Sequence, residues 1–210
     1  MGQPIDLIAG LGNPEPKYLT TRHNAGFWFV DALAARYGGR FSPQKKLEGD
    51  TAEVSIEGHR VRLLKPTTYM NESGRSLAKA MNYYKLPLGN VLVVHDELDL
   101  PPGRVKLKFD GGHAGHNGMR SVIEHVGAAC WRLRIGVGHP GAGRREEVLA
   151  HVLRRADATE EDLILQTIRD ALDVVPVFLE QGAQIAQNRL NQRKPEPGGA
   201  QVPDSTDASD

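Results

Sequence analysis

The run Val91-Leu92-Val93-Val94 is the feature that most constrains how this chain can fold. An apolar, β-branched run without polar alternation is typical of a strand that is covered on both faces, as in a sheet with helices on each side. The run is followed by His95-Asp96-Glu97, so polar and ionisable side chains stand at the carboxyl end of this buried strand. The surrounding sequence should therefore alternate between strands and amphipathic helices.

That alternation is visible along most of the chain. Short apolar or alternating runs predict strands at about 5–12, 51–56, 60–65, 91–94, 104–109 and 132–138. Apolar residues at helical spacing predict helices at about 24–37, 73–84, 118–126, 144–154 and 160–181. Pro176 should kink or interrupt the last helix. We expect a single three-layer α/β domain, with a mixed, twisted central sheet flanked by helices, over residues 1–192.

The end of the chain differs in composition from the rest. Residues 193–210 are rich in Pro, Gly, Ser and Asp and almost lack apolar side chains, which predicts a disordered acidic tail. The whole chain has 26 basic and 26 acidic residues, and four of the acids lie after residue 194, where no Lys or Arg occurs. The remainder therefore has 26 basic against 22 acidic residues, an excess of +4. This mild excess permits a phosphate-binding face without requiring one.

No segment of the sequence indicates a membrane or secretory location. No run approaches the roughly 18 apolar residues of a membrane helix, and the start lacks a basic region followed by an apolar stretch. Cys130 is the single cysteine, which excludes an internal disulfide and agrees with a reducing compartment. We expect a cytoplasmic protein in which Cys130 is a small buried residue rather than a nucleophile.

Common catalytic motifs are missing from the sequence. Gly10-Leu11-Gly12 follows a predicted strand, but Glu15 stands where a dinucleotide fingerprint needs its third glycine. There is no phosphate-binding P-loop, nucleophile elbow or zinc-binding helix motif. A metal could in principle be ligated by His95, Asp96, His113 and His116. Two of these histidines lie in a glycine-rich loop rather than on a rigid element, so we expect no metal and no cofactor.

Polar residues do occur where loops leave the predicted strands. They are Asn13, His23, Asn71, Asp96 and Asn117. In open α/β sheets the carboxyl ends of the strands are the usual ligand site. Each of these residues also has a structural interpretation, and taken alone each favours it, since asparagines cap helices and form turns and an aspartate pairs with lysine. From these residues alone we predict an α/β enzyme or binding domain with a candidate His/Asp site.

Two predicted strands carry basic residues at every second position. Lys106 and Lys108 share one face of their strand, and Arg132 and Arg134 share a face of theirs. Such a face either is simply solvated or contacts phosphates, which would position a nucleic acid without reading its sequence.

Six blocks of the sequence occur in the order of a known family. They are GLGNP (10–14), TRHNAG (21–26) preceded by Tyr18, KPTTYMNESG (65–74), HDELDLPPG (95–103), GHNG (115–118) and RLRIGVGHP (132–140). In these blocks the chain resembles the bacterial-type peptidyl-tRNA hydrolases. The resemblance extends from about residue 5 to 190, and the tail has no counterpart.

This resemblance implies a reaction and a set of site residues. The reaction would be hydrolysis of the ester between a peptide and the terminal ribose of tRNA, with peptidyl-tRNA as the partner and no membrane or obligatory protein partner. His23 matches the catalytic base of the family and Asp96 its partner. A histidine with a pKa of about 6.5 can take a proton from water at neutral pH, so neither a covalent nucleophile nor a metal is needed.

The remaining site residues follow from the same resemblance. The substrate-positioning asparagines of the family fall on Asn13, Asn71 and Asn117, of which Asn117 could also donate to the oxyanion. Three further positions, Tyr18, Met70 and His116, match residues that line the cleft. Lys108 and Arg134 match residues that contact tRNA phosphates.

The sequence departs from the family pattern at three places. The segment between Gly127 and Arg132 is shorter than expected, Glu72 replaces a neutral or apolar residue, and Asp110 puts a negative charge near the proposed phosphate path.

One alternative function is that of an RNA-binding relative on the same fold that does not hydrolyse its ligand. The other is a metal-dependent hydrolase that would use His95, Asp96, His113 and His116 as its ligands. A monomer is the expected state.

Overall fold

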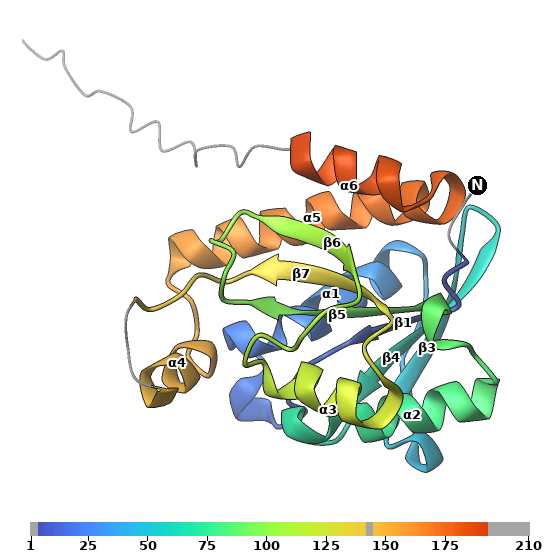
Figure 1. Ribbon diagram of the computed structural model, residues 1–210, viewed down its shortest axis with the longest axis horizontal. Coiled ribbons are helices and arrows are strands. Elements are labelled where there is room, and N and C mark those ends of the chain that lie inside the picture. Colours follow the sequence, from blue (N-terminus) through green and yellow to red (C-terminus); the bar gives the residue numbers. More distant parts are fainter. Residues whose placement is uncertain (1–3, 142–144, 193–210) are drawn as a thin grey trace, which may run out of the picture.

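The computed structural model describes residues 4–141 and 145–192, and within them a seven-stranded sheet has helices on both faces (Figure 1). The strands are β1 (Leu7–Gly10), β2 (Ser42–Gln44), β3 (Gly49–Ile56), β4 (His59–Pro66), β5 (Val91–Glu97), β6 (Val105–Phe109) and β7 (Trp131–Gly136). The α-helices are α1 (Ala25–Arg36), α2 (Ser73–Tyr84), α3 (Asn117–Val126), α4 (Arg145–Val152), α5 (Ala158–Gln181) and α6 (Ala183–Gln192). The predicted α/β class is confirmed. The segment 193–210, predicted to be a disordered tail, lies outside the described residues.

The sheet is mixed, as predicted. Its strand order is β2-β3-β4-β1-β5-β7-β6. The four central strands β4, β1, β5 and β7 are parallel, while β2, β3 and β6 pair antiparallel with their neighbours. Because β1 has β4 on one side and β5 on the other, the carboxyl end of β1 lies at a topological switch point, the place where α/β sheets usually bind ligands.

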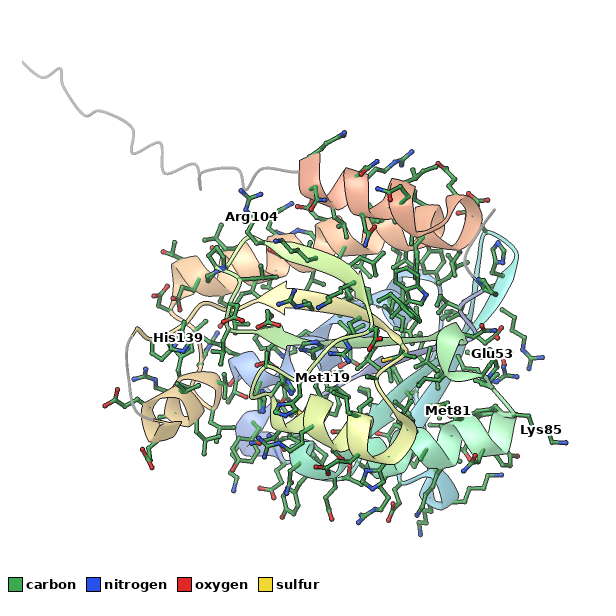
Figure 2. All side chains as sticks on the ribbon, viewed as in Figure 1. Glu53, Met81, Lys85, Arg104, Met119 and His139 are labelled. Atoms are coloured by element: carbon green, nitrogen blue, oxygen red, sulfur yellow. The ribbon has the colours of Figure 1, made fainter. Side chains whose placement is uncertain are left out.

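Strand β5 is covered on both faces, as its apolar run predicted. All seven of its residues are buried. Leu92 and Val94 pack into the core that contains residues of α1, α5 and α6, and Val91 and Val93 pack into the core with α2 and α3. Figure 1 shows α5 and α6 on one side of the sheet and α2 and α3 on the other, and Met119 of α3 is buried in this second core (Figure 2).

Two glycines let β1, α1 and β5 approach with their backbones in contact. A Cβ atom on Gly10 would lie 2.2 Å from the carbonyl oxygen of Gly26, and a Cβ on Gly26 would lie 2.4 Å from that of Val94. No other residue type fits at this separation. The close approach brings the residues just before α1 against the carboxyl end of β5.

Three features differ from the sequence-based expectations. Helix α5 is not interrupted at Pro176 but continues to Gln181. The proline removes only one N–H donor from the helix, and the nearby Val175 and Phe178 stay packed in the core. Strand β2 and helix α6 were not predicted, since neither has a clear apolar pattern. Helix α6 buries only Ala186 and Leu190. Among the described residues, no helix is long and apolar enough to span a membrane.

Candidate active site

His23 and Asp96 form a buried pair at the carboxyl end of β5. His23 lies in the short 3₁₀ helix Arg22–Asn24 that precedes α1, and its Nδ1 is 2.9 Å and 3.0 Å from the two carboxylate oxygens of Asp96. The two side chains are only 7% and 2% exposed. Since a carboxylate accepts, Nδ1 carries the proton, and Nε2 is left as an acceptor that has no hydrogen-bond partner among the described residues. This is the tautomer that a general base requires.

His116 contacts the same carboxylate, with its ring centroid 4.8 Å from that of His23. Its Nε2 is 2.8 Å from Oδ1 of Asp96, and its Nδ1 accepts a hydrogen bond from the backbone N–H of Met119 at 3.2 Å. His116 is thus the N-cap residue of α3. Because Nδ1 is used as an acceptor, the proton resides on Nε2 and is donated to Asp96. The start of α3 therefore fixes the tautomer of His116.

The electrostatics of the site keep Asp96 ionised. Burial by itself would raise the pKa of Asp96, but the charges and hydrogen bonds of His23 and His116 outweigh it and hold the pKa well below its usual value. His95 stands beside them and donates from Nδ1 to the backbone oxygen of Asp96 at 2.7 Å. Burial, assisted by the proximity of His116, lowers the pKa of His95 to about 3, so His95 is neutral.

Asn13 connects three segments around this pair. Its backbone N–H donates to Oδ1 of Asn24, and Nδ2 of Asn24 donates to the carbonyl oxygen of Asn13, both at 2.9 Å. The side-chain oxygen of Asn13 accepts the N–H of Met70, also at 2.9 Å. Asn13 thereby fixes the turn that carries Asn71 next to the His23 segment and retains its Nδ2 as a donor.

Asn71 and Asn117 do not cap helices, so that structural interpretation is wrong for both. The N-cap of α3 is His116, and the side chain of Glu72, at the N-cap of α2, makes no capping hydrogen bond. Asn71 is exposed and Asn117 is half-buried. Neither side-chain amide has a hydrogen-bond partner among the described residues, which leaves both amides for a ligand.

A cavity of about 110 Å³ opens beside the His23–Asp96 pair. Both polar and apolar residues line it, the full set being His23, Asp96, Glu97, Leu98, Ala114, Gly115, His116, Asn117, Val148, Leu149 and Val152. The last three belong to α4, which lies where the arrowheads of β5 and β7 point (Figure 1). No sequence signal indicated that α4 is part of the site, because the residues it contributes are all apolar.

Arg22 holds α4 in this position. It is buried, and its Nη1 donates to the carbonyl oxygens of His151, Arg154 and Arg155 at 3.1–3.3 Å. Its Nη2 forms an ion pair with Glu160. These carbonyls lie in the last turn of α4 and just beyond its C-terminus, where a cation is favourable. The residue preceding His23 therefore ties the apolar wall of the cavity to the catalytic segment.

The basic side chains of β6 and β7 share one face of the sheet. Lys106 lies opposite Arg134 and Lys108 opposite Arg132. The two lysines are exposed. Arg132 is buried and donates to the carbonyl oxygens of Gly111 and Gly112, so the interpretation as a purely solvated face is wrong for this residue.

The two acidic departures from the family pattern have local partners. Glu72 pairs with Arg75 of α2 at 2.9 Å. Asp110 adopts a left-handed conformation (φ 61°) at the start of the glycine loop, where its carboxylate accepts the N–H of Gly111. Both charges are therefore engaged within their own turns.

The residues considered for a metal site do not assemble as one. Within the described part of the chain, the group with metal-ligand spacing is His23, Asp96 and His116, without His95 or His113. Metal–ligand bonds of 2.0–2.2 Å would separate tetrahedral ligand atoms by about 3.4 Å. The nitrogen–oxygen distances of 2.8 Å and 2.9 Å suit shared protons better than a shared ion.

Comparison with known proteins identifies the family. The family model described as peptidyl-tRNA hydrolase matches residues 7–197. A peptidyl-tRNA hydrolase of Acinetobacter baumannii is 46% identical over 191 residues, which cover 91% of this chain and 98% of that protein. Another, from Halorhodospira halophila, is 51% identical over 174 residues, or 82% and 89% of the two chains. This chain belongs to the peptidyl-tRNA hydrolase family.

Solved structures agree with this assignment. A crystal structure of peptidyl-tRNA hydrolase from Acinetobacter baumannii has a TM-score of 0.89 and 45% sequence identity, and the match covers 93% of this chain and 99% of that one. The resemblance inferred from the six sequence blocks is confirmed, and so is the fold it implied.

Not all residues inferred from the peptidyl-tRNA hydrolase resemblance line the cavity. His23, Asp96, His116 and Asn117 do, whereas Asn13, Tyr18, Met70 and Asn71 stand outside it. Met70 is only 4% exposed and packs into the core with α2 and α3, so it supports the turn that carries Asn71 from within the core. Tyr18 is half-buried in the 3₁₀ helix Pro16–Tyr18.

Proposed function

We propose that this chain hydrolyses the ester that joins a peptide, or an N-blocked aminoacyl group, to the 3′-terminal ribose of tRNA, using His23 as the general base. The observation that carries the proposal is the pairing of His23 Nδ1 with both oxygens of buried Asp96. This pairing leaves Nε2 of His23, which lines the cavity, without a hydrogen-bond partner among the described residues. The reaction returns free tRNA from prematurely released peptidyl-tRNA.

The first step activates water. Nε2 of His23 takes a proton from a water molecule as its oxygen attacks the ester carbonyl, and Asp96 stabilises the imidazolium that forms. The developing oxyanion accepts a hydrogen bond from the amide of Asn117. When the tetrahedral intermediate collapses, the bond to the ribose oxygen breaks and that oxygen receives the proton from His23. One water is consumed, and the products are the peptide acid and tRNA.

His116 acts as a positioning residue in this scheme, because it touches Asp96 rather than the reacting atoms. Its hydrogen bond occupies Oδ1 of the carboxylate and limits the orientations that Asp96 can adopt. No metal enters the proposed reaction, since His23 supplies the base and Asn117 the donor.

Substrate binding is assigned to groups around the cavity. The Nδ2 donor of Asn13 and the amide of Asn71, which have no partner among the described residues, are suited to the peptide main chain, which they would bind without regard to side chains. Tyr18 and Met70 border and support that region. The charged groups of Lys108 and Arg134 are proposed to contact tRNA phosphates. We propose that residues 1–192 act as one monomeric catalytic domain in the cytoplasm, where peptidyl-tRNA arises and where the free thiol of Cys130 would stay reduced.

The test is release of the acyl group from N-acetyl-aminoacyl-tRNA in EDTA, with wild type beside His23→Ala. Loss of a general base should lower kcat by about 10²–10⁴-fold. The exposed His59, the first residue of β4, provides a control in His59→Ala, which should keep full activity. Binding of tRNA without turnover by the wild type would favour the non-hydrolytic alternative, and activity that depends on added metal would favour the metal hydrolase.

The roles of the asparagines can be separated kinetically. Asn117→Ala should lower kcat by roughly 10²–10³-fold, as expected for a lost oxyanion donor. Asn71→Ala should act mainly on KM, because its exposed amide is proposed to bind the ground-state peptide. A change confined to KM for Asn117→Ala would remove it from the oxyanion role.

A further inference from the structure

Glu97 is a buried carboxylate that the proposed reaction does not use. It is the last residue of β5, follows Asp96 directly and is 6% exposed. One carboxylate oxygen accepts the N–H of Asp99 at 3.1 Å, and the other accepts Nε–H of Arg134 at 2.8 Å. A buried carboxylate is costly unless it is paired, so this residue needs an explanation.

The hydrogen bond to Arg134 engages only one edge of the guanidinium. Within the described residues, Nη1 and Nη2 of Arg134 have no hydrogen-bond partner, and the side chain is 21% exposed. A guanidinium held through Nε presents its remaining N–H groups in a fixed plane, the geometry that binds a phosphate through two parallel hydrogen bonds.

The surroundings of Arg134 suit an anion. Lys106 lies directly opposite on β6, and Lys108 is two residues further along the same exposed face. Arg132, the fourth basic residue of this face, is occupied by loop carbonyls. Of the two arginines on this face, Arg134 is the one whose Nη1 and Nη2 have no partner among the described residues, and it is the one that a carboxylate fixes in place.

Glu97 also lines the cavity that contains His23 and Asp96. We propose that Glu97 is a positioning residue that orients Arg134 for a tRNA phosphate and so sets the distance between that phosphate and the ester at the catalytic pair. This inference rests on the proposed function and adds a residue to it. Because Asp96 and Glu97 are adjacent in one rigid strand, the base and the phosphate anchor share a single frame.

A double-mutant cycle tests this inference, with KM measured for N-acetyl-aminoacyl-tRNA. Glu97→Ala should raise KM about tenfold, as for loss of one charge-assisted hydrogen bond. Glu97→Gln should be intermediate, since one amide oxygen must serve both Asp99 and Arg134. In the Arg134→Ala background, Glu97→Ala should add nothing further.

A second substrate separates positioning from a local structural effect. The N-acetyl-aminoacyl ester of adenosine has the reacting ester but no phosphate. The ratio of kcat/KM between the tRNA substrate and this ester should fall in the Glu97 variants. The matched control is Glu53→Gln, which removes an ion pair of 2.7 Å with Arg60 in the β3–β4 hairpin, far from α4 (Figure 2), and it should leave the ratio unchanged.

Three outcomes would overturn the inference: additive effects in the cycle, equal losses on both substrates, or a lower KM in Glu97→Gln. The last would mean that Glu97 merely neutralises Arg134. If Glu97→Ala does not fold, as judged by thermal melting, Glu97→Gln carries the test. If the wild type binds tRNA but hydrolyses neither substrate, the proposed function fails, and the same cycle on the Kd for tRNA still decides the role of Glu97.

Discussion

At the scale of single residues, the site depends on which histidine nitrogens carry protons. His23 and His116 both donate to Asp96, while His95 donates to the backbone and leaves its buried Nε2 without a partner in the described structure. Of the three neighbouring rings, His95 is therefore the one that burial keeps neutral. A proton added to His95 would meet no acceptor, and this predicts how stability responds to acid.

His95 should make the protein less stable as the pH falls. Its pKa drops from 6.5 to about 3 on folding, so between these values the unfolded chain binds the extra proton, and stability is present above about pH 6.5 and lost below it. The slope from this group is about 1.4 kcal/mol per pH unit. His95→Asn retains a donor near Nδ1 but cannot titrate, so its unfolding free energy should have a shallower slope between about pH 4 and 6 in urea titrations. Identical slopes for variant and wild type would contradict this.

At the scale of elements, the N-terminus of α3 contributes to the site through its N-cap residue as well as through Asn117. Its N-cap, His116, connects the first turn of the helix to Asp96. The helix is held against α2, where a Cβ on Gly74 would lie 2.1 Å from the carbonyl oxygen of Ser121. A shift of α3 would therefore move His116 and the catalytic carboxylate together.

The capping role of His116 and its contact with Asp96 should be separable. His116→Ala should lose about 1 kcal/mol of stability with the N-cap and also lose activity. His116→Asn restores a good N-cap, but its amide cannot reach Asp96 as Nε2 does, so it should regain stability and remain impaired in kcat. Thermal unfolding and kcat measured on the same preparations check this. Full activity in His116→Asn would show that the contact with Asp96 is dispensable.

At the scale of the whole molecule, charge is distributed unevenly around a neutral total. The sheet places Lys106, Lys108 and Arg134 on one face. The carboxylates nearby are engaged locally, since Glu97 accepts a hydrogen bond from Arg134 and Asp110 accepts the N–H of Gly111. The net charge of the chain does not indicate a polyanionic substrate, whereas the gathering of basic side chains on one face of the sheet suits one.

Neutralising this face should weaken the salt dependence of the reaction. Lys108→Ala and Arg134→Ala should each raise KM for the tRNA substrate. Each should also reduce the slope of log(kcat/KM) against log salt by roughly one, the contribution of one phosphate contact. Kinetics over a salt series measure both effects, with Lys85→Ala, at the end of α2 (Figure 2), as the exposed control. An unchanged slope in both variants would exclude phosphate contacts by these residues.

Much of the fold was predictable because it follows from local patterns. The run at 91–94 predicted a strand covered on both faces, and glycines and prolines marked the turns around it. The six sequence blocks predicted the family and, through it, the His23–Asp96 pair. What failed were features with weak local signals: β2, the polar helix α6, and the path of α5 through Pro176, where core packing outweighs the loss of one hydrogen bond.

The sequence by itself determined the α/β class, the family and the chemical types of the reacting groups, because these depend on residue identity and spacing along the chain. Tertiary structure alone decided that His116 shares Asp96, that Arg22 holds the apolar wall of α4 over the cavity, and that Glu97 faces Arg134. Each of these contacts joins residues that are far apart in the chain, and it forms only when glycine-mediated close packing and strand register place them together. Neither local propensity nor periodicity contains that information.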